Sequence, residues 1–444
     1  MRTNPEATTS LRSPYRHRPS HIKTSRQQAF RQRLCEICLN IDLKLDSVSA
    51  HLEQAIGGHD VLSEMSVCSP PTSSCLNRNC DHCGVENAEK HIKQNLTCAS
   101  TSVKWQSWDL VRKENGQRKE KVEHEGTITD LVKILMKDLT TYSKHVFVYR
   151  WQFQQYKALL AKLPSLQQIA VMVCDFAENY LCRYQNEVHS AHWGYNQVTV
   201  HPCVLFYPCL ACRSLVTDYL VFLSDDLTHG AHMVETILAN TKGYLRKEAG
   251  IEKSKLPFFY MSSFTDVEWA YFGSRHGKSP CDSCGGAVKT AVDEDVVGEG
   301  ITIQDAETMY QHLMLHHSLP DPDSAPTNCV HTMRSYWVIR KEDINRPLPS
   351  SALKTIKGTR QVHSLRGLGD KKISTRNLSC FCDCCMGDVA SVCTSKGYAE
   401  DWQQKEINFA KSWSTPSALS HGTPPTASES HAQPASPPLS LPDQ

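Results

Sequence analysis

The chain has 444 residues, 20 of them cysteine, and its formal net charge is +1. A chain of this length buries a sizeable core and predicts two or three domains, while its balanced charge gives no global attraction to nucleic acid or membrane. No apolar run approaches the roughly 18 residues needed to cross a bilayer, and the N-terminus lacks the apolar core of a secretion signal. We therefore expect no membrane partner, and reduced thiols that bind zinc rather than disulfides.

Residues 1–34 carry eight lysines and arginines against a single acid, Glu6, and few large apolar residues. This composition predicts a disordered basic arm. Such an arm can lie along phosphate backbones or act as a nuclear import signal, and the alternative is a merely solvated tail. On the first interpretation we expect DNA as a partner and a nuclear or nucleo-cytoplasmic location.

Residues 35–98 contain two CxxC pairs, Cys35 with Cys38 and Cys80 with Cys83. Each tight turn presents two sulfurs on one side, so two such turns can supply four thiolates to one structural zinc. The sequence predicts a zinc-binding module here, the alternative being buried free thiols. Two cysteines between the pairs could replace one pair or help to hold a second ion: Cys68 and Cys75.

Residues 99–126 are charged and show no periodic apolar pattern, so we interpret them as a linker. From 127 to 164 apolar residues recur three or four positions apart, which predicts amphipathic helix ending at Pro164.

The apolar run from Ile169 to Cys174 predicts a strand buried on both faces, and Asp175 follows it directly. A carboxylate at the end of such a strand is costly to bury unless a cation compensates it, so Asp175 is a candidate metal ligand. The alternative is that Asp175 caps a helix that begins at Phe176. Further elements are expected as strands at 196–207, 215–223 and 258–261, and as a helix at 231–248.

The order strand, strand, strand, helix, strand is the opening topology of the ribonuclease-H fold. We therefore predict an α/β protein with a ribonuclease-H-like mixed sheet and flanking helices in residues 165–345. Cys-rich zinc-binding modules and disordered termini, the last beyond about 413, complete the expected organisation.

A glycine-flanked polar loop follows at 276–289, and a helix is expected to begin near Ala287. Its CxxC pair, Cys281 and Cys284, has Cys209 and Cys212 as candidate partners for a metal ion.

The segment 346–395 ends in five thiols within fourteen residues, a density that favours zinc over packing. The spacing does not determine which four of the five bind. The candidate set that we select is Cys380, Cys382, Cys385 and Cys393.

These motifs resemble a large eukaryotic family of transposon-related proteins, over roughly residues 34–393. The resemblance rests on the CxxC pair that begins at Cys35, on Gly358-Thr-Arg360 with His363, and on Leu378-Ser-Cys-Phe-Cys382. Three core motifs carry most of it: Asp175-Phe-Ala-Glu-Asn-Tyr180, the strand end Ser224-Asp225-Asp226, and the His276-Gly-Lys278 loop with Asp282, Gly285-Gly286 and Val288-Lys289.

The resemblance implies a ribonuclease-H-like, DDE-transposase core with zinc-binding flanks. In that class, carboxylates from separate elements hold two divalent ions about 4 Å apart, and oxygen ligands suit Mg²⁺ or Mn²⁺. Asp175 matches the first acid, Asp282 is a candidate for a later acid, and Glu178 lies near them in sequence. Phosphate contacts would come from three residues: His276, Lys278 and Lys289.

The chain departs from this family in one place. Relatives have a strand ending in Asp-Gly before the segment that begins at Ser254, whereas here the helix passes from Tyr244–Gly250 almost directly to Lys255. We interpret this as a deletion that removes a strand and its carboxylate. Asp225 and Asp266 are acids that could substitute, and neither sits in the matching motif.

Three functions are therefore compatible with the sequence. The first is a transposase-derived nuclease or DNA-strand transferase. The second is a non-catalytic, degenerate copy that uses its basic arm and zinc modules for DNA or protein contacts, and the missing Asp-Gly motif favours it. The third is an unstable relic of a mobile element, and a homo-oligomer is compatible with the first two.

Overall fold

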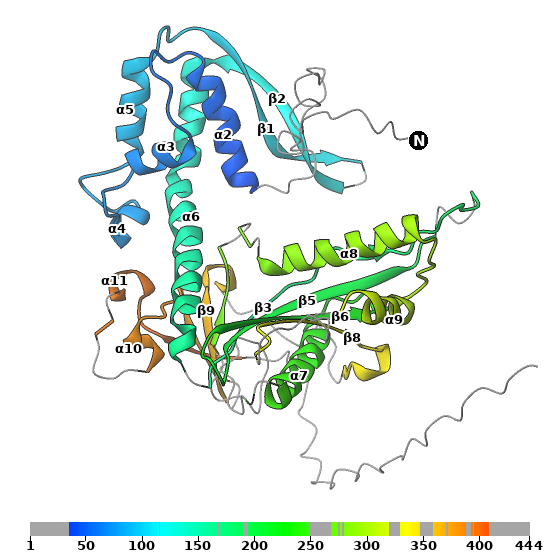
Figure 1. Cartoon of the computed structure of the whole chain (residues 1–444). Coiled ribbons are helices and arrows are strands. Elements are labelled where there is room, and N and C mark those ends of the chain that lie inside the picture. The colour runs from blue at the N-terminus through cyan, green and yellow to red at the C-terminus, as the bar shows by residue number, and fades with distance from the viewer. Residues whose placement is uncertain are drawn as a thin grey trace, which may run out of the picture.

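The computed structural model describes residues 35–407 except 115, 167, 190–193, 249, 251–267, 274–275, 278, 319–328, 347–357, 370–371, 388–391 and 394. The expected basic arm and the expected disordered tail lie outside the described residues. The described chain is a mixed α/β structure whose parts adjoin one long helix, α6 (Ile128–Lys162) (Figure 1). Within this described part, no helix is both long and apolar enough to cross a membrane.

The N-terminal module packs around the first half of α6. Leucines four positions apart on this helix, Leu131, Leu135 and Leu139, are fully buried against Ile41 and Leu45 of α2. This spacing places one apolar stripe on one helix face, which explains why the segment forms an amphipathic helix. The surrounding helices are α2 (Glu36–Ser49), α3 (His59–Met65), α4 (Ser73–Leu76) and α5 (Val85–Asn95).

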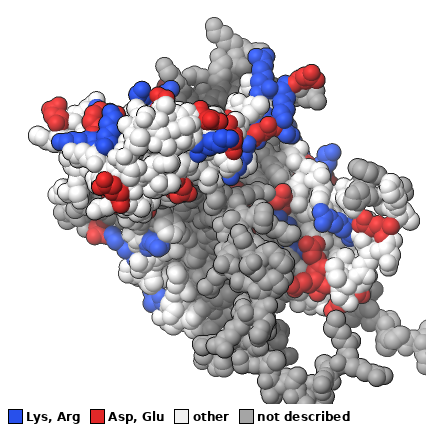
Figure 2. Space-filling view, turned by 90° about the horizontal axis from the view of Figure 1, so that it is seen from above, with Lys and Arg blue, Asp and Glu red and all other residues white. Residues whose placement is uncertain are grey.

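The segment interpreted as a linker is instead an antiparallel hairpin, β1 (Ser102–Lys113) and β2 (Gly116–Thr127). Val103 and Trp105 are buried while Lys104 and Gln106 are exposed, which is the two-residue alternation of a half-buried strand. Away from that end the hairpin is highly charged and projects beyond the module (Figure 1). On the face shown in Figure 2, acidic and basic side chains are intermixed over the described residues.

The central sheet has the order β3-β5-β6-β8. β3 (Val171–Cys174), β5 (Gln197–Pro208) and β6 (Leu215–Ser224) form an antiparallel meander, and β8 (Thr332–Val338) is parallel to β6. The short β4 (Tyr180–Leu181) pairs with the beginning of β5. Within the described chain, β3 therefore has a neighbouring strand on one edge.

Both faces of this sheet are covered by helices. Leu220 and Phe222 of β6 pack on α7 (Ala231–Glu248), whereas Val221 and Leu223 pack toward the other face. That second face is covered by α8 (Pro280–Gly298) and α9 (Ala306–His316) (Figure 1). Burial on both faces is why these strands are continuous apolar runs in the sequence.

A smaller antiparallel sheet of order β11-β10-β9-β7 lies beside the second half of α6. The side chain of Trp151 on α6 donates to the carbonyl of Ser379 at 2.8 Å, and Gln152 accepts from the Ser379 amide at 2.9 Å. The strands are β7 (Glu268–Ala270), β9 (Ser364–Gly369), β10 (Lys372–Arg376) and β11 (Gln403–Glu406). Short helices also occur: α10 (Asp383–Met386), α11 (Lys396–Ala399), η3 (Leu163–Ser165), η5 (Lys341–Asp343) and η7 (Thr359–Gln361).

Most predicted core elements are confirmed. The strands expected at 196–207 and 215–223 are β5 and β6, and the helix expected at 231–248 is α7. The helix expected near Ala287 begins earlier, at Pro280, because Ser279 and Asp282 form a capping box there. The expected cap at Asp175 is wrong, since no helix begins at Phe176, and the strand expected at 258–261 lies outside the described residues.

Candidate metal centres

The structure gathers cysteines and histidines into four groups of four, and within each group the ligand atoms lie within 4.8 Å of one another. Four donors saturate the tetrahedral coordination that structural zinc prefers. We name the groups by their residues: group A is Cys35, Cys38, His145 and His276; group B is Cys68, Cys75, Cys80 and Cys83; group C is Cys209, Cys212, Cys329 and His331; group D is Cys380, Cys382, Cys385 and Cys393.

Group A joins three distant segments of the chain. Cys35 and Cys38 lie at the start of α2, His145 is on α6, and His276 is in the loop before α8. Cys35 Sγ is 3.3 Å from His145 Nε2, Cys38 Sγ is 3.2 Å from His276 Nε2, and the two Nε2 atoms are 3.1 Å apart. Lone pairs at that separation repel unless a proton or a cation lies between them. Tetrahedral zinc places its donors about 3.3–3.8 Å apart, which agrees with this cluster.

His276 reaches group A because its loop approaches α6 closely. A Cβ atom built on Gly273 would lie 2.5 Å from the Cα atom of Tyr149, so the loop needs glycine at this position. The ring of Tyr149 stacks on His276 with centroids 3.8 Å apart. Helix packing therefore holds the imidazole in place before any ion binds.

Gly273→Ala is expected to weaken metal binding at group A while groups B, C and D keep their ions, because the added methyl group displaces the His276 loop. The measurement is zinc per chain together with alkylation of Cys35 and Cys38. The matched control is Gly286→Ala, where an added Cβ meets no atom within 4 Å. Equal zinc content and equal alkylation in the two variants would contradict the assignment of His276.

Group B lies within one short segment of the N-terminal module. Cys68 Sγ and Cys80 Sγ are 3.9 Å apart, and Cys75 lies in α4 behind its cap, Thr72. Arg78 fastens the segment to α6 by donating to the carbonyl oxygens of Leu139 and Thr140 at 2.7 and 2.9 Å. An ion at group B would thus stabilise a segment that has little core of its own.

Group C lies where the β5–β6 turn meets the residues before β8. Cys209 and Cys212 form a tight turn, in which the Arg213 amide donates to the carbonyl of Cys209 at 3.0 Å. Cys212 Sγ is 3.0 Å from His331 Nε2, and Cys329 completes the group. Group C would therefore tie the meander to the parallel strand β8.

Group D lies beside the C-terminal sheet. Cys393 Sγ is 3.9 Å from Cys380 Sγ and 3.6 Å from Cys385 Sγ. The guanidinium of Arg376 lies 3.6 Å from Cys385 Sγ, and its positive charge favours a thiolate there. The same guanidinium lies over the Trp402 ring at 4.9 Å, so the group is packed against β10 and the chain before β11.

In groups A, B and C one thiol has a pKa lowered to about 6 or below. The pKa of Cys35 is lowered to about 2, chiefly by its hydrogen bond with Cys38 and further by His145 and His276. The Thr72 hydroxyl chiefly lowers the pKa of Cys75 to about 5. The Ser214 hydroxyl chiefly lowers the pKa of Cys212 to about 6. The pKa of Cys38 is raised in turn, chiefly by its hydrogen bond with Cys35, so without an ion this pair favours one thiolate. Thiolates are the form that binds metal, so a bound ion would have to displace the second proton.

The four cysteines selected near the C-terminus are those that group D brings together, and each CxxC pair supplies half of group A or group B. The alternative in which Cys68 and Cys75 replace one pair agrees with group B. The expected pairing of Cys35 and Cys38 with Cys80 and Cys83 on one ion is wrong, because the two pairs belong to separate groups. The expected partnership of Cys281 and Cys284 with group C is also wrong. Both thiols are buried in the core, and Cys281 donates to the carbonyl of Val173 at 3.1 Å.

His276 was expected to contact phosphate and lies instead in group A. Lys289, the second expected phosphate contact, is partly buried and donates to the backbone carbonyl of Glu178 at 2.9 Å. Lys278 lies outside the described residues. The sequence reasoning did not identify His145, Cys329 or His331 as ligands.

Asp175 directly follows β3 and is exposed, contrary to the carboxylate buried at a strand end that the sequence suggests. Partial desolvation by the surrounding atoms chiefly raises the pKa of Asp175, and the negative charge of Asp282 raises it further, so the two carboxyl groups are within electrostatic reach. Close packing explains the approach, since a Cβ on Gly285 of α8 would lie 2.9 Å from the Cβ of Ala177. Asp282 also caps α8, where its Oδ2 accepts from the Ser279 amide at 2.8 Å.

The other acids do not complete this pair. Glu178 is exposed, and its backbone carbonyl accepts a hydrogen bond from Lys289 at 2.9 Å. Asp225 caps α9 by accepting from the Ala306 amide at 2.8 Å, and Asp266 lies outside the described residues. Among the described residues, neither Asp175 nor Asp282 belongs to a group of three or more metal-ligating atoms within 4.8 Å.

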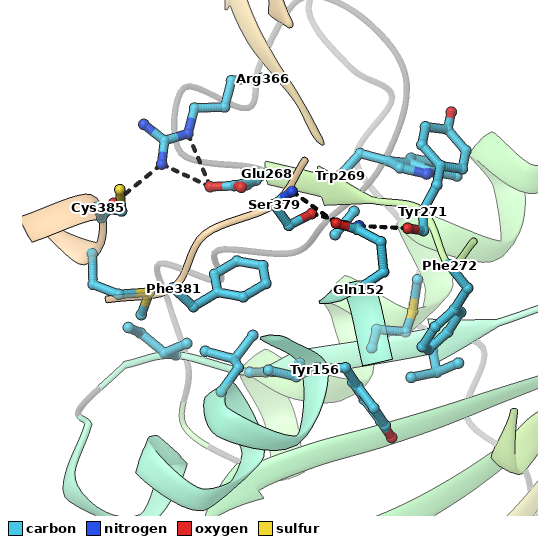
Figure 3. A pocket seen from close by; sticks show the side chains of 18 of the residues that line it. Gln152, Tyr156, Glu268, Trp269, Tyr271, Phe272, Arg366, Ser379, Phe381 and Cys385 are labelled. Atoms are coloured by element: carbon cyan, nitrogen blue, oxygen red, sulfur yellow. Dashed lines mark hydrogen bonds and ion pairs between the residues drawn. The ribbon is translucent and has the colours of Figure 1, made fainter. Parts of the chain in front are cut away.

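A cavity of about 490 Å³ runs along β3 on the side away from β5 and is walled by α6 and the C-terminal sheet. Figure 3 shows Phe381, Tyr156 and Phe272 around it, with the ion pair between Glu268 and Arg366 at 2.7 Å on its rim. Gln152 closes one end, where its Nε2 donates to the carbonyl of Tyr271 at 2.6 Å. In the described chain, open space rather than a strand therefore adjoins this edge of β3.

Comparison with known proteins adds one family. A family model described as a domain of unknown function (DUF8701) matches residues 152–263 and 253–379. The two matches together span more than half of the chain and meet at residues 253–263. Searches of curated proteins and of solved structures each gave no significant match.

Proposed function

The chain belongs to the family of proteins with this domain of unknown function (DUF8701), and we propose that it is a metal-stabilised, transposase-like protein that binds nucleic acid. Its ribonuclease-H-like core would carry an incomplete two-metal centre and therefore lack nuclease activity. The observation that carries the proposal is the packing of α8 at the end of β3, since it places Asp282 within electrostatic reach of Asp175, at one end of the first core strand.

The open edge that β3 has in the described chain supports the proposal that the two-metal centre lacks a carboxylate. The sequence analysis expects a deleted strand near residue 250, and the strand that ends in Asp175 lacks a second neighbour among the described residues. The two family matches also meet at residues 253–263, close to the expected deletion. In-line displacement by two ions needs ligands for both, and two carboxylates alone leave the second ion poorly held.

The four Cys/His groups support a structural role for zinc. Each supplies four donors and therefore keeps no open position for substrate. The basic composition of residues 1–34 supports a nucleic-acid partner, because lysine and arginine release counterions when they neutralise phosphates. The second candidate function is an active DDE-type nuclease or strand transferase, and the same carboxylate pair favours it.

A nuclease assay in Mg²⁺ and in Mn²⁺ separates these two functions, and we expect no cleavage by the native chain. Asp175→Asn and Asp282→Asn are the test variants, because asparagine keeps the side-chain volume and can still cap α8. Glu235→Gln, at an exposed position of α7, is the matched control. Cleavage that is lost in both test variants and kept in the control would establish the enzyme and refute the incomplete centre.

DNA binding is tested separately by its salt dependence. We expect the logarithm of affinity to fall with the logarithm of salt by about 0.9 per neutralised phosphate, and deletion of residues 1–34 to flatten that slope. If the deletion leaves the salt dependence unchanged, residues 1–34 do not contact DNA phosphates. Absence of any binding by the native chain would leave the protein-adaptor function as the surviving hypothesis.

A further inference from the structure

A fifth group of potential ligands lies outside groups A to D and contains no cysteine. The side chains of Asp295, His312 and His317 converge between the C-terminal half of α8 and the end of α9. Asp295 Oδ2 is 2.8 Å from His312 Nε2 and 2.6 Å from His317 Nε2. We propose that these three residues bind a divalent transition metal ion, zinc in the first place, with coordination positions left open to water.

The scaffold holds the three donors independently of any ion. Val292 and Val296 of α8 and Leu313 of α9 are buried in one core cluster, so the two helices are fixed against each other. The end of α9 is anchored to β8, because Tyr336 donates its hydroxyl to the carbonyl of His317 at 3.2 Å. Rigid helices of this kind can position ligands precisely.

The charge at this place also favours a cation. Within the described part of the chain, Asp295 forms ion-pair contacts with His312 and His317 and with no lysine or arginine. Its side chain is 20 % exposed and that of His312 is 9 % exposed, so water only partly solvates the carboxylate. Both Nε2 atoms lie against one carboxylate oxygen, and a divalent ion among the three donors would balance the carboxylate charge and use both nitrogen lone pairs.

The donor set distinguishes this site from groups A to D. Two imidazole nitrogens and one carboxylate oxygen suit zinc and other first-row divalent ions, and the lack of thiolate weakens retention of a soft metal. Three protein ligands are typical of zinc sites that keep water or substrate as a fourth ligand. The side chain of His317 is 25 % exposed, which provides a route to solvent for an exchanging ion.

An ion requires a small adjustment of the present contacts. Zinc about 2.0–2.1 Å from each donor sets neighbouring donors about 3.3 Å apart, so each imidazole would withdraw by roughly half an ångström.

The site is also remote from the proposed nuclease-like edge. Asp282 lies in the first turn of α8 and Asp295 near its last turn, which is about 20 Å away at 1.5 Å per residue.

Metal exchange on the full chain, loaded with zinc under reducing conditions, tests the proposal. A weak chelator is expected to remove one equivalent of zinc from the native chain and to leave the ions at groups A to D. Asp295→Asn and His317→Gln should release no zinc to the weak chelator. In calorimetry with zinc as the titrant, both chelator-treated variants should bind the ion at least about 100-fold more weakly than the chelator-treated native chain. Asparagine and glutamine can still form hydrogen bonds here, so both variants should fold.

The matched control is His316→Ala, because His316 lies in the same turn of α9 but is exposed and outside the group. It should keep the exchangeable equivalent. A native chain with no exchangeable zinc, or variants that keep it, would overturn the proposal and leave a hydrogen-bonded contact between α8 and α9. This outcome does not depend on DNA binding or nuclease activity, so it is separate from failure of the proposed function.

Discussion

Removal of zinc by a strong chelator under reducing conditions is expected to unfold the N-terminal module and release it from the central sheet. Group A is the reason for the second effect, because its ligands come from α2, from α6 and from the loop before α8. Structural zinc contributes on the order of 10 kcal/mol in zinc-finger peptides, which is comparable to the total stability of many domains. Thermal unfolding and limited proteolysis, each with and without chelator, measure the effect.

Cys38→Ser should reproduce part of this loss, since it removes a buried ligand of group A. Cys98→Ser is the matched control, because Cys98 is exposed and belongs to no group among the described residues. The chelator effect should be absent if the groups are ordinary buried thiols. Less than half an equivalent of zinc in protein purified under reducing conditions, with group A alkylated in the native state, would exclude the metal.

The sequence predicted metal ligands well where they are close together in the chain. All four ligands of group D lie between Cys380 and Cys393, so their density alone was informative. A CxxC pair reveals only half of a site whose other half comes from another element. The missing half of group A is His145 and His276, and His145 lies next to the buried residues Tyr142 and Val146 of α6.

A polar histidine on the buried stripe of an amphipathic helix was the signal that could have identified this ligand. For group C the corresponding signal was the short Cys329-Val-His331 pair, which could complement Cys209 and Cys212. Neither signal names its partner, because the pairing depends on how the helices and strands pack. Ligand sets assembled from distant segments are therefore a tertiary property.

The hairpin was missed for a different reason. Its high charge was interpreted as a solvated linker, although Val103 and Trp105 alternate with polar residues and Asn115-Gly116 is a strong hairpin signal. The core strands were easier to predict, since burial on both faces makes them continuous apolar runs. Their order in the sheet could not be predicted from such runs, because a run does not identify its neighbours.

The second large effect is expected at a buried polar network between the central sheet and α7. Asp218 of β6 is 2 % exposed. Its Oδ2 accepts from the hydroxyl groups of Tyr207 and Tyr244, the latter at 2.9 Å, and its Oδ1 accepts from the Met333 amide at 3.1 Å. These contacts join β5, α7 and the beginning of β8, next to group C. The sequence analysis did not identify them, because Asp218 is a lone acid within an apolar run.

Asp218→Ala is expected to lower the free energy of unfolding by about 3 kcal/mol or more. The substitution removes the acceptor shared by three donors, of which Tyr244 keeps only the weak sulfur acceptor of Met333 at 3.3 Å. Each buried donor left without a partner costs about 1–3 kcal/mol. Tyr244→Phe should cost less, because it removes one donor and leaves the carboxylate two others. Chemical denaturation monitored by circular dichroism measures both values, and an equal loss in the two variants would contradict the network.

The pH dependence gives an independent check. Burial is the chief cause that raises the pKa of Asp218 in the folded chain, while the tyrosine hydroxyls partly oppose it. A carboxyl group whose folded pKa is raised stabilises the fold most below its unfolded pKa, near 3.9, and loses that contribution as pH rises through the folded value. Asp218→Asn should remove this part of the pH dependence. Because the network joins β5, α7 and the beginning of β8, its disruption should loosen group C as well as α7.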